Sequence, residues 1–215
     1  EGSGHQSRNL DLKAETSFNV DLGMKFRHQY VYLETTYFIN TIYDGIRISL
    51  TGNTVNGIPE YRNVNIDRLR LQGFEGLGRV GSKLGVSFAA NFSYLTSKDL
   101  GNPELPYVDT YSSKLNLHFR YDNPKDLFWI EYHIRHNGNQ KDIDLGNNPI
   151  GSTIPGFTVH NLRVGTTLFR NSAFPQRVGI TVGNLTNTLY SEFSNASFFR
   201  PAPQRHIVFT WFTRF

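Results

Sequence analysis

Basic side chains recur at alternate positions in several segments of this sequence, and they are the residues whose types and spacing best suit chemistry. The basic residues that share the polar side of such segments are Lys25, Arg68, Arg70, Lys83, Lys114, Arg120, Arg135, Arg163, Arg177 and Arg214. The acids expected on the same sides are Asp21, Glu34 and Glu131. Because arginine and lysine pair well with carboxylate oxygens, the pattern predicts a cationic surface that contacts anionic groups. The open alternative is that a wet surface tolerates any charge and that strands elsewhere balance it.

The sequence contains no constellation typical of an enzyme: we find no G-x-S-x-G, no P-loop and no H-E-x-x-H. The 7 histidines are scattered, and on a strand His133 and His136 would lie on opposite faces. The sequence has no cysteine, which excludes a thiolate metal site and a disulfide framework. The net charge of +4 is mild. We therefore expect no metal, no cofactor and no nucleic-acid partner.

The elements that position the basic residues are β-strands, because apolar and polar residues alternate and no helical period is sustained. Nine segments alternate in this way: 17–26, 29–40, 64–75, 83–94, 114–121, 128–135, 161–168, 177–183 and 204–215. In the third segment the alternation fails at Gly73 and Phe74, which predicts a β-bulge there. That bulge would place Leu69 on the apolar face and its basic neighbours on the polar face.

The last segment is apolar and aromatic on one face and ends on an aromatic residue. The residues of that face are Ile207, Phe209, Trp211, Thr213 and Phe215. This pattern resembles the closing-strand signal by which bacterial outer-membrane β-barrels are delivered to the barrel-assembly machinery. We therefore expect that machinery to be a partner.

The strand lengths and the connections favour a transmembrane β-barrel in contact with outer-membrane lipid. No run of 18 apolar residues exists in the sequence, so a transmembrane helix is not expected. The segments are long enough for tilted strands that cross a bilayer, and short connections alternate with long ones such as 43–61, 95–108, 136–155 and 189–203. Nine strands are an odd number for a bacterial barrel. We interpret residues 1–215 as the C-terminal part of a larger barrel, a fragment or processed product whose first strand has a missing neighbour.

Five short motifs, in order along the chain, resemble those of TonB-dependent outer-membrane receptors. They are NLDLKAETS at 9–17 with DLG at 21–23, LQGFE at 71–75, PGFTVHNL at 155–162, VGNLTNTLY at 182–190 and PAPQR at 201–205. Ala14 stands where the family usually has proline, and Gln204 stands where it usually has glycine.

The resemblance implies a barrel of about 22 strands that is closed by an N-terminal plug domain. It implies active uptake of a scarce nutrient, most readily an iron chelate such as a ferric siderophore or haem, with energy relayed by the TonB complex through the plug. The implied location is the outer membrane of a Gram-negative bacterium. Three alternatives remain: a passive porin, an outer-membrane barrel enzyme, and a soluble β-sandwich binding module.

Strand direction sorts the candidate residues into two sets. The expected ligand-binding set is Tyr43, Arg47, Arg68, Tyr107, Lys114, His133, Arg135, His136, Arg163, Phe199, Arg200 and His206, on the long-loop side or in the loops. The set expected to face the plug is Lys25, Lys83, Arg120, Arg177 and Arg214.

Overall fold

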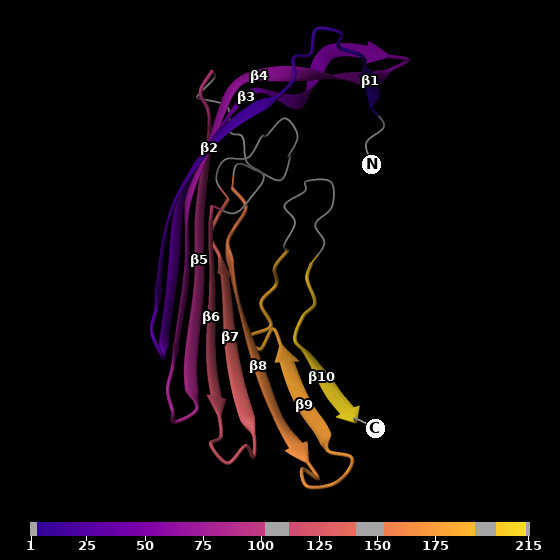
Figure 1. The fold of residues 1–215 in the computed structure, drawn as a ribbon. Coiled ribbons are helices and arrows are strands. Elements are labelled where there is room, and N and C mark those ends of the chain that lie inside the picture. Colours follow the sequence, from indigo (N-terminus) through magenta and orange to yellow (C-terminus); the bar gives the residue numbers. More distant parts are fainter. Residues whose placement is uncertain (1–3, 102–111, 141–152, 192–200, 214–215) are drawn as a thin grey trace.

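The chain forms one curved antiparallel sheet, in which each strand from β2 to β10 pairs with its neighbours in sequence (Figure 1). The computed structural model describes residues 4–101, 112–140, 153–191 and 201–213. Its strands are β1 (His5–Ser7), β2 (Thr16–Arg27), β3 (Val31–Val55), β4 (Ile58–Gly81), β5 (Val86–Asp99), β6 (Ser113–Asp122), β7 (Trp129–Asn137), β8 (Phe157–Leu168), β9 (Gln176–Gly183) and β10 (His206–Thr213). The nine predicted strands correspond to β2–β10, so the expected up-and-down antiparallel arrangement is confirmed.

No helix among the described residues has the length and apolar character needed to cross a membrane.

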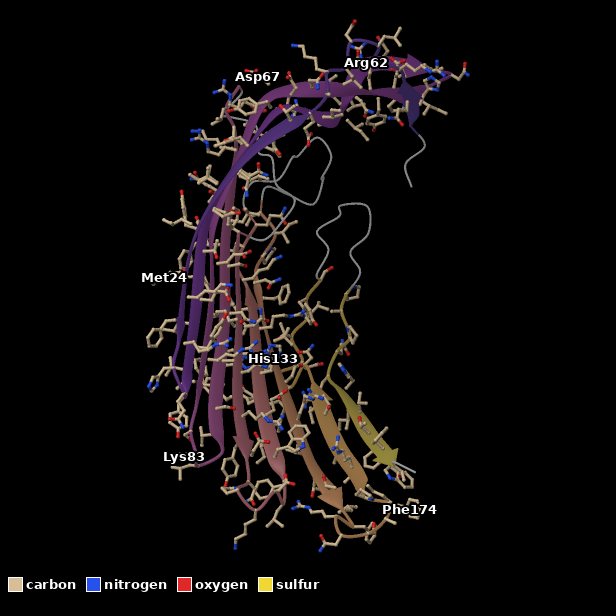
Figure 2. The ribbon with its side chains drawn as sticks, viewed as in Figure 1. Met24, Arg62, Asp67, Lys83, His133 and Phe174 are labelled. Carbon is tan, nitrogen blue, oxygen red and sulfur yellow. The ribbon has the colours of Figure 1, made fainter. Side chains whose placement is uncertain are left out.

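The two faces of the sheet differ in chemistry. Met24 points away from the concave side of the sheet (Figure 2), and we name its side the outward face. Directly paired residues share a face, so the register carries the outward face across the sheet, for example from Ile130 to Val164 and then to Ile180 and Phe209. Exposed apolar side chains on this face include Met24, Ile130, Ile180 and Phe209. An apolar face of this width is suited to lipid, and the opposite, inward face is polar.

The β-bulge predicted at Gly73 and Phe74 is absent. The pairing of β4 with β3 runs without a shift from Val31 opposite Val80 to Tyr43 opposite Arg68, and the pairing with β5 is continuous as well. The prediction was wrong because it assumed that apolar residues always face outward.

Without a bulge, the β4 residues that precede Gly73 lie on the opposite faces from those predicted. Leu69 shares the inward face with Leu77 and is only 2% exposed. Arg68 and Arg70 share the outward face with Phe74, so the inward placement predicted for them is also wrong.

The long connection predicted for 43–61 is instead a continuation of β3 and β4, which pair up to Val55 and Ile58. The two strands are joined by Asn56 and Gly57, which both have positive φ (52° and 77°), as a type I′ turn requires. The hairpin bends over the concave side of the sheet (Figure 1). We call residues 45–66 the overhang. β1, which the sequence did not predict, pairs in parallel with β4 at Glu60, Tyr61 and Arg62 of the overhang.

Glu60 accepts side-chain hydrogen bonds near the tip of the overhang. The Thr51 hydroxyl donates a hydrogen bond of 2.8 Å to the Glu60 carboxylate, and the Asn53 amide donates one of 3.3 Å. These bonds favour the charged form and lower the pKa of Glu60. A lowered pKa in the folded hairpin means that the stabilisation is present above the unfolded carboxyl pKa and is lost as the pH falls through the folded value.

We expect hydrogen-exchange protection of residues 51–60, corrected for intrinsic rates, to fall when the pH is lowered through the acid range. Glu60→Gln cannot titrate and should show a flat profile. An equal loss of protection in Glu60→Gln would contradict the assignment.

β2 and β10 form the two edges of the sheet, and each has one side without a strand partner among the described residues. The register places Ile207, Phe209 and Trp211 of the predicted closing strand together on the outward face, where all three are exposed, while Val208 and Phe212 are exposed on the inward face. Phe215 lies outside the described residues.

Candidate functional site

The inward face gathers, from separate strands, most of the candidate residues that lie in the described part of the chain. The residues that the register places there are Lys25, Lys114, Arg120, His133, Arg135, Arg163, Arg177 and His206. Three candidates lie on the outward face instead: Tyr43, Arg68 and His136. Arg47 belongs to the overhang and Lys83 to the β4–β5 turn. Tyr107, Phe199, Arg200 and Arg214 lie outside the described residues.

At the short-turn end, two arginines are held by acids and by a tryptophan ring. Arg120 donates two hydrogen bonds to Asp122, of 2.8 and 2.7 Å, and a third of 3.2 Å to Glu131. Arg163 approaches the other Glu131 oxygen at 3.3 Å. Both guanidinium groups lie over the Trp129 ring, at 4.6 and 5.8 Å. The charge of these arginines is therefore largely neutralised within the sheet.

Lys25 is also paired. Its ammonium lies 2.9 Å from Glu34, which accepts a second hydrogen bond from the Tyr32 hydroxyl. Further acids on the inward face, which the sequence argument did not count, are Glu75, Asp99 and Asp122. The predicted strongly cationic wall is therefore a mixed wall, in which Lys25, Arg120 and Arg163 have acidic partners.

Four inward cations, Arg27, Arg79, Lys114 and Arg177, have no ion-pair partner in the described parts of the chain. Lys114 is exposed and lines a hollow of 280 Å³ together with Glu34, Glu75 and Asn116. Arg177 is exposed near the opposite end of the wall and lies across from Phe212. These two side chains, together with Arg27 and Arg79, which line the larger groove, remain available to an anionic group.

A pair of stacked histidines occupies the middle of the inward face. The rings of His118 and His133 lie 4.1 Å apart at 16°. His133 Nε2 is buried without a hydrogen-bond partner, and the Asn161 amide lies 3.5 Å from its Nδ1. No group of three or more metal-ligating side chains occurs among the described residues. Sequence spacing could not reveal this pair, because the strand register is what brings His118 opposite His133.

Toward the long-loop end, Arg135 is packed in an aromatic cage. Its guanidinium donates a hydrogen bond of 3.1 Å to the Tyr190 hydroxyl and lies 5.5 Å from the ring centroids of both Phe157 and Tyr190. The two rings are 4.5 Å apart and pack with buried Val159. Arg135 therefore connects the wall to the segment after β9 and is less free for a ligand than the sequence predicts.

Hydrogen bonds within the motif at 182–190 position Tyr190 in that cage. Asn184 is 2% exposed with φ of 50°, and its amide donates to the carbonyls of Thr188 and Pro203. Its backbone N–H donates to the Asn161 side chain, and its side-chain oxygen accepts from the Thr188 N–H. Asn187, also at positive φ, accepts a hydrogen bond from the Arg205 N–H. The two asparagines thus hold the described parts of the β9–β10 connection, residues 184–191 and 201–205, in place beside β8.

A larger groove of 980 Å³ runs along the short-turn half of the concave side. It is lined by residues that include Arg27, Tyr32, Arg79, His118 and Glu131. Figure 2 shows His133 at mid-height, with side chains from several strands around it. The wall thus offers a polar surface with donors and acceptors from most of the described strands.

Comparisons with known proteins agree with this architecture. The family model described as "TonB dependent receptor-like, beta-barrel" matches residues 2–185. A protein named "Transferrin-binding protein A" from Neisseria meningitidis serogroup B is 34% identical over 148 residues, which is 60% of this chain and 16% of the relative. A protein named "Probable TonB-dependent siderophore receptor PirA" from Acinetobacter baumannii is 30% identical over 165 residues, which is 68% of this chain and 21% of the relative.

Solved structures show the same fold. The chain superposes on the copper transporter OprC with a TM-score of 0.74 and 18% identity, over 95% of this chain and 32% of that one. The FrpB iron transporter from Neisseria meningitidis gives a TM-score of 0.72 at 17% identity, over 97% of this chain and 32% of that one. This chain therefore spans about a third of the solved structures and about a sixth to a fifth of the curated relatives it matches. Proteins of the TonB-dependent receptor-like β-barrel family are receptors and transporters of the outer membrane of Gram-negative bacteria, and the family is not one of enzymes. This chain belongs to that family.

Proposed function

We propose that this chain forms part of the barrel wall of an outer-membrane receptor that takes up an iron chelate, a ferric siderophore or haem, with energy supplied through TonB. The observation that carries the proposal is the inward face of a family barrel, where polar and charged side chains from β2 to β9 converge on one concave surface. The matched relatives are named for a siderophore, for transferrin and, in Haemophilus influenzae, for hemoglobin and hemoglobin-haptoglobin. Each of these names concerns iron in some form.

The charge arrangement supports two tiers on this wall. We assign Lys114 to the ligand on the long-loop side, together with His133 and His206, which lie closer to the short turns than Lys114 does. Arg120 and Arg163, which share the acid Glu131, form the tier that would contact the plug, together with Lys25 and Arg177. The sequence predicted Arg163 as a ligand-binding residue. We assign it to the plug tier instead, because Arg163 and Arg120 both lie directly opposite Glu131, at the same height on the wall. The loop candidates Tyr107, Phe199 and Arg200 remain proposals for ligand contact.

The test is direct binding and uptake in an intact receptor that contains this wall, screened with ferric siderophores and haem under iron limitation. We expect Lys114→Gln to weaken binding of an anionic ferric chelate by about tenfold, because a charge-assisted contact is lost. Lys125→Gln in the short β6–β7 connection removes the same charge far from the ligand and should leave binding unchanged. Equal affinities in both variants would remove the ligand tier from the proposal.

A passive porin is the second candidate, since the wall is polar and has no buried binding pocket in its described part. Planar-bilayer recordings distinguish the two functions. Ion conductance without saturable chelate binding would support the porin and contradict the uptake receptor. Saturable binding with uptake that stops when the proton gradient is dissipated would support energised transport.

A further inference from the structure

On the outward face of the described strands below the overhang, lysine and arginine side chains occur at one place. From the bend at Asp44 to the short turns, the described positions of β2–β10 that share the face of Met24 include no aspartate and no glutamate. The lysines and arginines at those positions are Arg68, Arg70 and Lys98. We call these three residues the outward basic cluster. Because these cations lie together on an outward face that carries no other lysine, arginine, aspartate or glutamate at the described strand positions below the overhang, we look for an anionic partner at this place.

The cluster is built on two paired strands and is open to the outside. Arg70 of β4 lies directly opposite Lys98 of β5, and Arg68 follows on the same face of β4. The Arg68 guanidinium lies 5.4 Å from the ring centroid of Tyr43, its partner on β3. All three basic residues are exposed, and none has an ion-pair partner within the described part of the chain. Strand pairing and the Tyr43 ring thus hold the cations in place without neutralising them.

The position of the cluster relative to the bilayer follows from the register. Phe74 lies opposite Tyr94, four positions short of Arg70 and Lys98 along their strands. Tyr37, on the neighbouring strand opposite Phe74, is also exposed on this face. Tyrosines favour the boundary between hydrocarbon and headgroups. Four strand residues span about 13 Å, less when the strand is tilted, so the cluster lies at headgroup height on the long-loop side, which faces the cell exterior in such barrels.

A lipid-sized apolar groove lies below the cluster on the same strands. A hollow of 350 Å³ is lined by Leu33, Gly76, Gly78, Ala90 and Phe92, among others. Gly76, Gly78 and Ala90 share the outward face with Arg70, and their small size leaves a channel between the larger Leu33 and Phe92. A chain of methylene groups fits such a surface, so the face offers a site for an acyl chain beneath a site for an anionic headgroup.

We propose that the outward basic cluster binds the phosphate groups of a phosphorylated glycolipid of the outer leaflet, with an acyl chain seated on the groove at Gly76 and Gly78. Arginine forms bidentate bonds to phosphate, and lysine adds a mobile point charge beside it. The outer leaflet of a Gram-negative outer membrane consists of glycolipids whose phosphates lie at this height. The nutrient in the lumen cannot reach the outward face, so this inference goes beyond the proposed uptake function and does not depend on it.

The test uses an intact receptor purified from outer membranes in mild detergent, with bound glycolipid counted by native mass spectrometry. Arg70→Gln/Lys98→Gln is the test variant. Lys83→Gln/Lys125→Gln, in the short turns at the other end of the wall, removes the same charge and is the control. We expect the test variant to bind added bisphosphorylated lipid A roughly tenfold more weakly than the control, since each cation near a membrane surface contributes to headgroup binding.

A second measurement does not depend on the folding of any variant. The unaltered receptor should bind bisphosphorylated lipid A more tightly than the same glycolipid after phosphatase treatment, and more tightly than phosphatidylglycerol. Arg70→Lys/Lys98→Arg should retain binding because both charges remain. Equal affinity for the dephosphorylated glycolipid or for phosphatidylglycerol, or equal retention in the test and control variants, would overturn the proposal.

Discussion

Gly73→Ala is expected to cost the barrel at least about 3 kcal/mol, the range of severe overpacking. A Cβ atom at this position would lie 2.3 Å from the Tyr94 carbonyl oxygen and 2.6 Å from Phe38 Cζ. The carbonyl belongs to a paired strand and cannot withdraw, and the Phe38 ring covers Gly73 from β3. The substitution must therefore break the β4–β5 pairing or expel Phe38.

Gly81→Ala is the matched control for this prediction, because Gly81 also lies on the inward face of β4 and a Cβ there would meet nothing within 4 Å. Heat-modifiable electrophoretic mobility measures the folded fraction in outer membranes, and urea unfolding in lipid vesicles measures the stability. Similar folded fractions for the two variants would mean that the strand pairing at Gly73 is looser than the register shows.

Asn184→Ala is expected to destabilise the closing segment by about 3 kcal/mol, because it removes several buried hydrogen bonds and leaves their partners unsatisfied. The lost bonds join Asn184 to the backbone of Thr188 and Pro203. Alanine is also poorly suited to a φ of 50°. Since these bonds place Tyr190 against Arg135, the cage at the upper wall should loosen as well.

Limited proteolysis of the 185–205 connection and urea unfolding measure this loss. Thr186→Ala is the control, because Thr186 is exposed and its hydroxyl contacts only Thr188 among the described groups. We expect rapid cleavage of the connection in Asn184→Ala and normal resistance in Thr186→Ala. Normal resistance in both variants would show that the connection is held by other contacts.

The strands could be predicted from the sequence because two solvents act on the two faces of each one. Where the outward face is apolar, as at Met24 and Phe209, apolar residues alternate with polar ones along each strand, and the prediction holds. Nearer the overhang this alternation is reversed, and Leu69 turns inward to be buried while Arg68 turns outward. The error at Gly73 therefore marks the point where the environment changes.

Side-chain contacts between neighbouring strands could not be predicted from the sequence, for a different reason. The pairing of Arg120 with Glu131 and the stacking of His118 on His133 follow from which residues the register sets opposite each other. Alternation fixes a face but not the neighbour on that face. The turn at Asn56 and Gly57 was within reach, because an Asn-Gly pair between strand-like residues is a strong hairpin indicator.

The unbroken pairing of β3 with β4 has a mechanical consequence for the mouth of the barrel. From Val31 to Leu50 no residue is gained or lost against the partner strand, so one strand cannot slide past the other without turning every side chain to the wrong face. The overhang is therefore fixed to the wall by continuous pairing as far as Leu50, and the first departure from this register lies between Leu50 and Thr54. Because the strands cannot slide, a force on the overhang would be transmitted along the paired strands β3 and β4 to their short-turn ends.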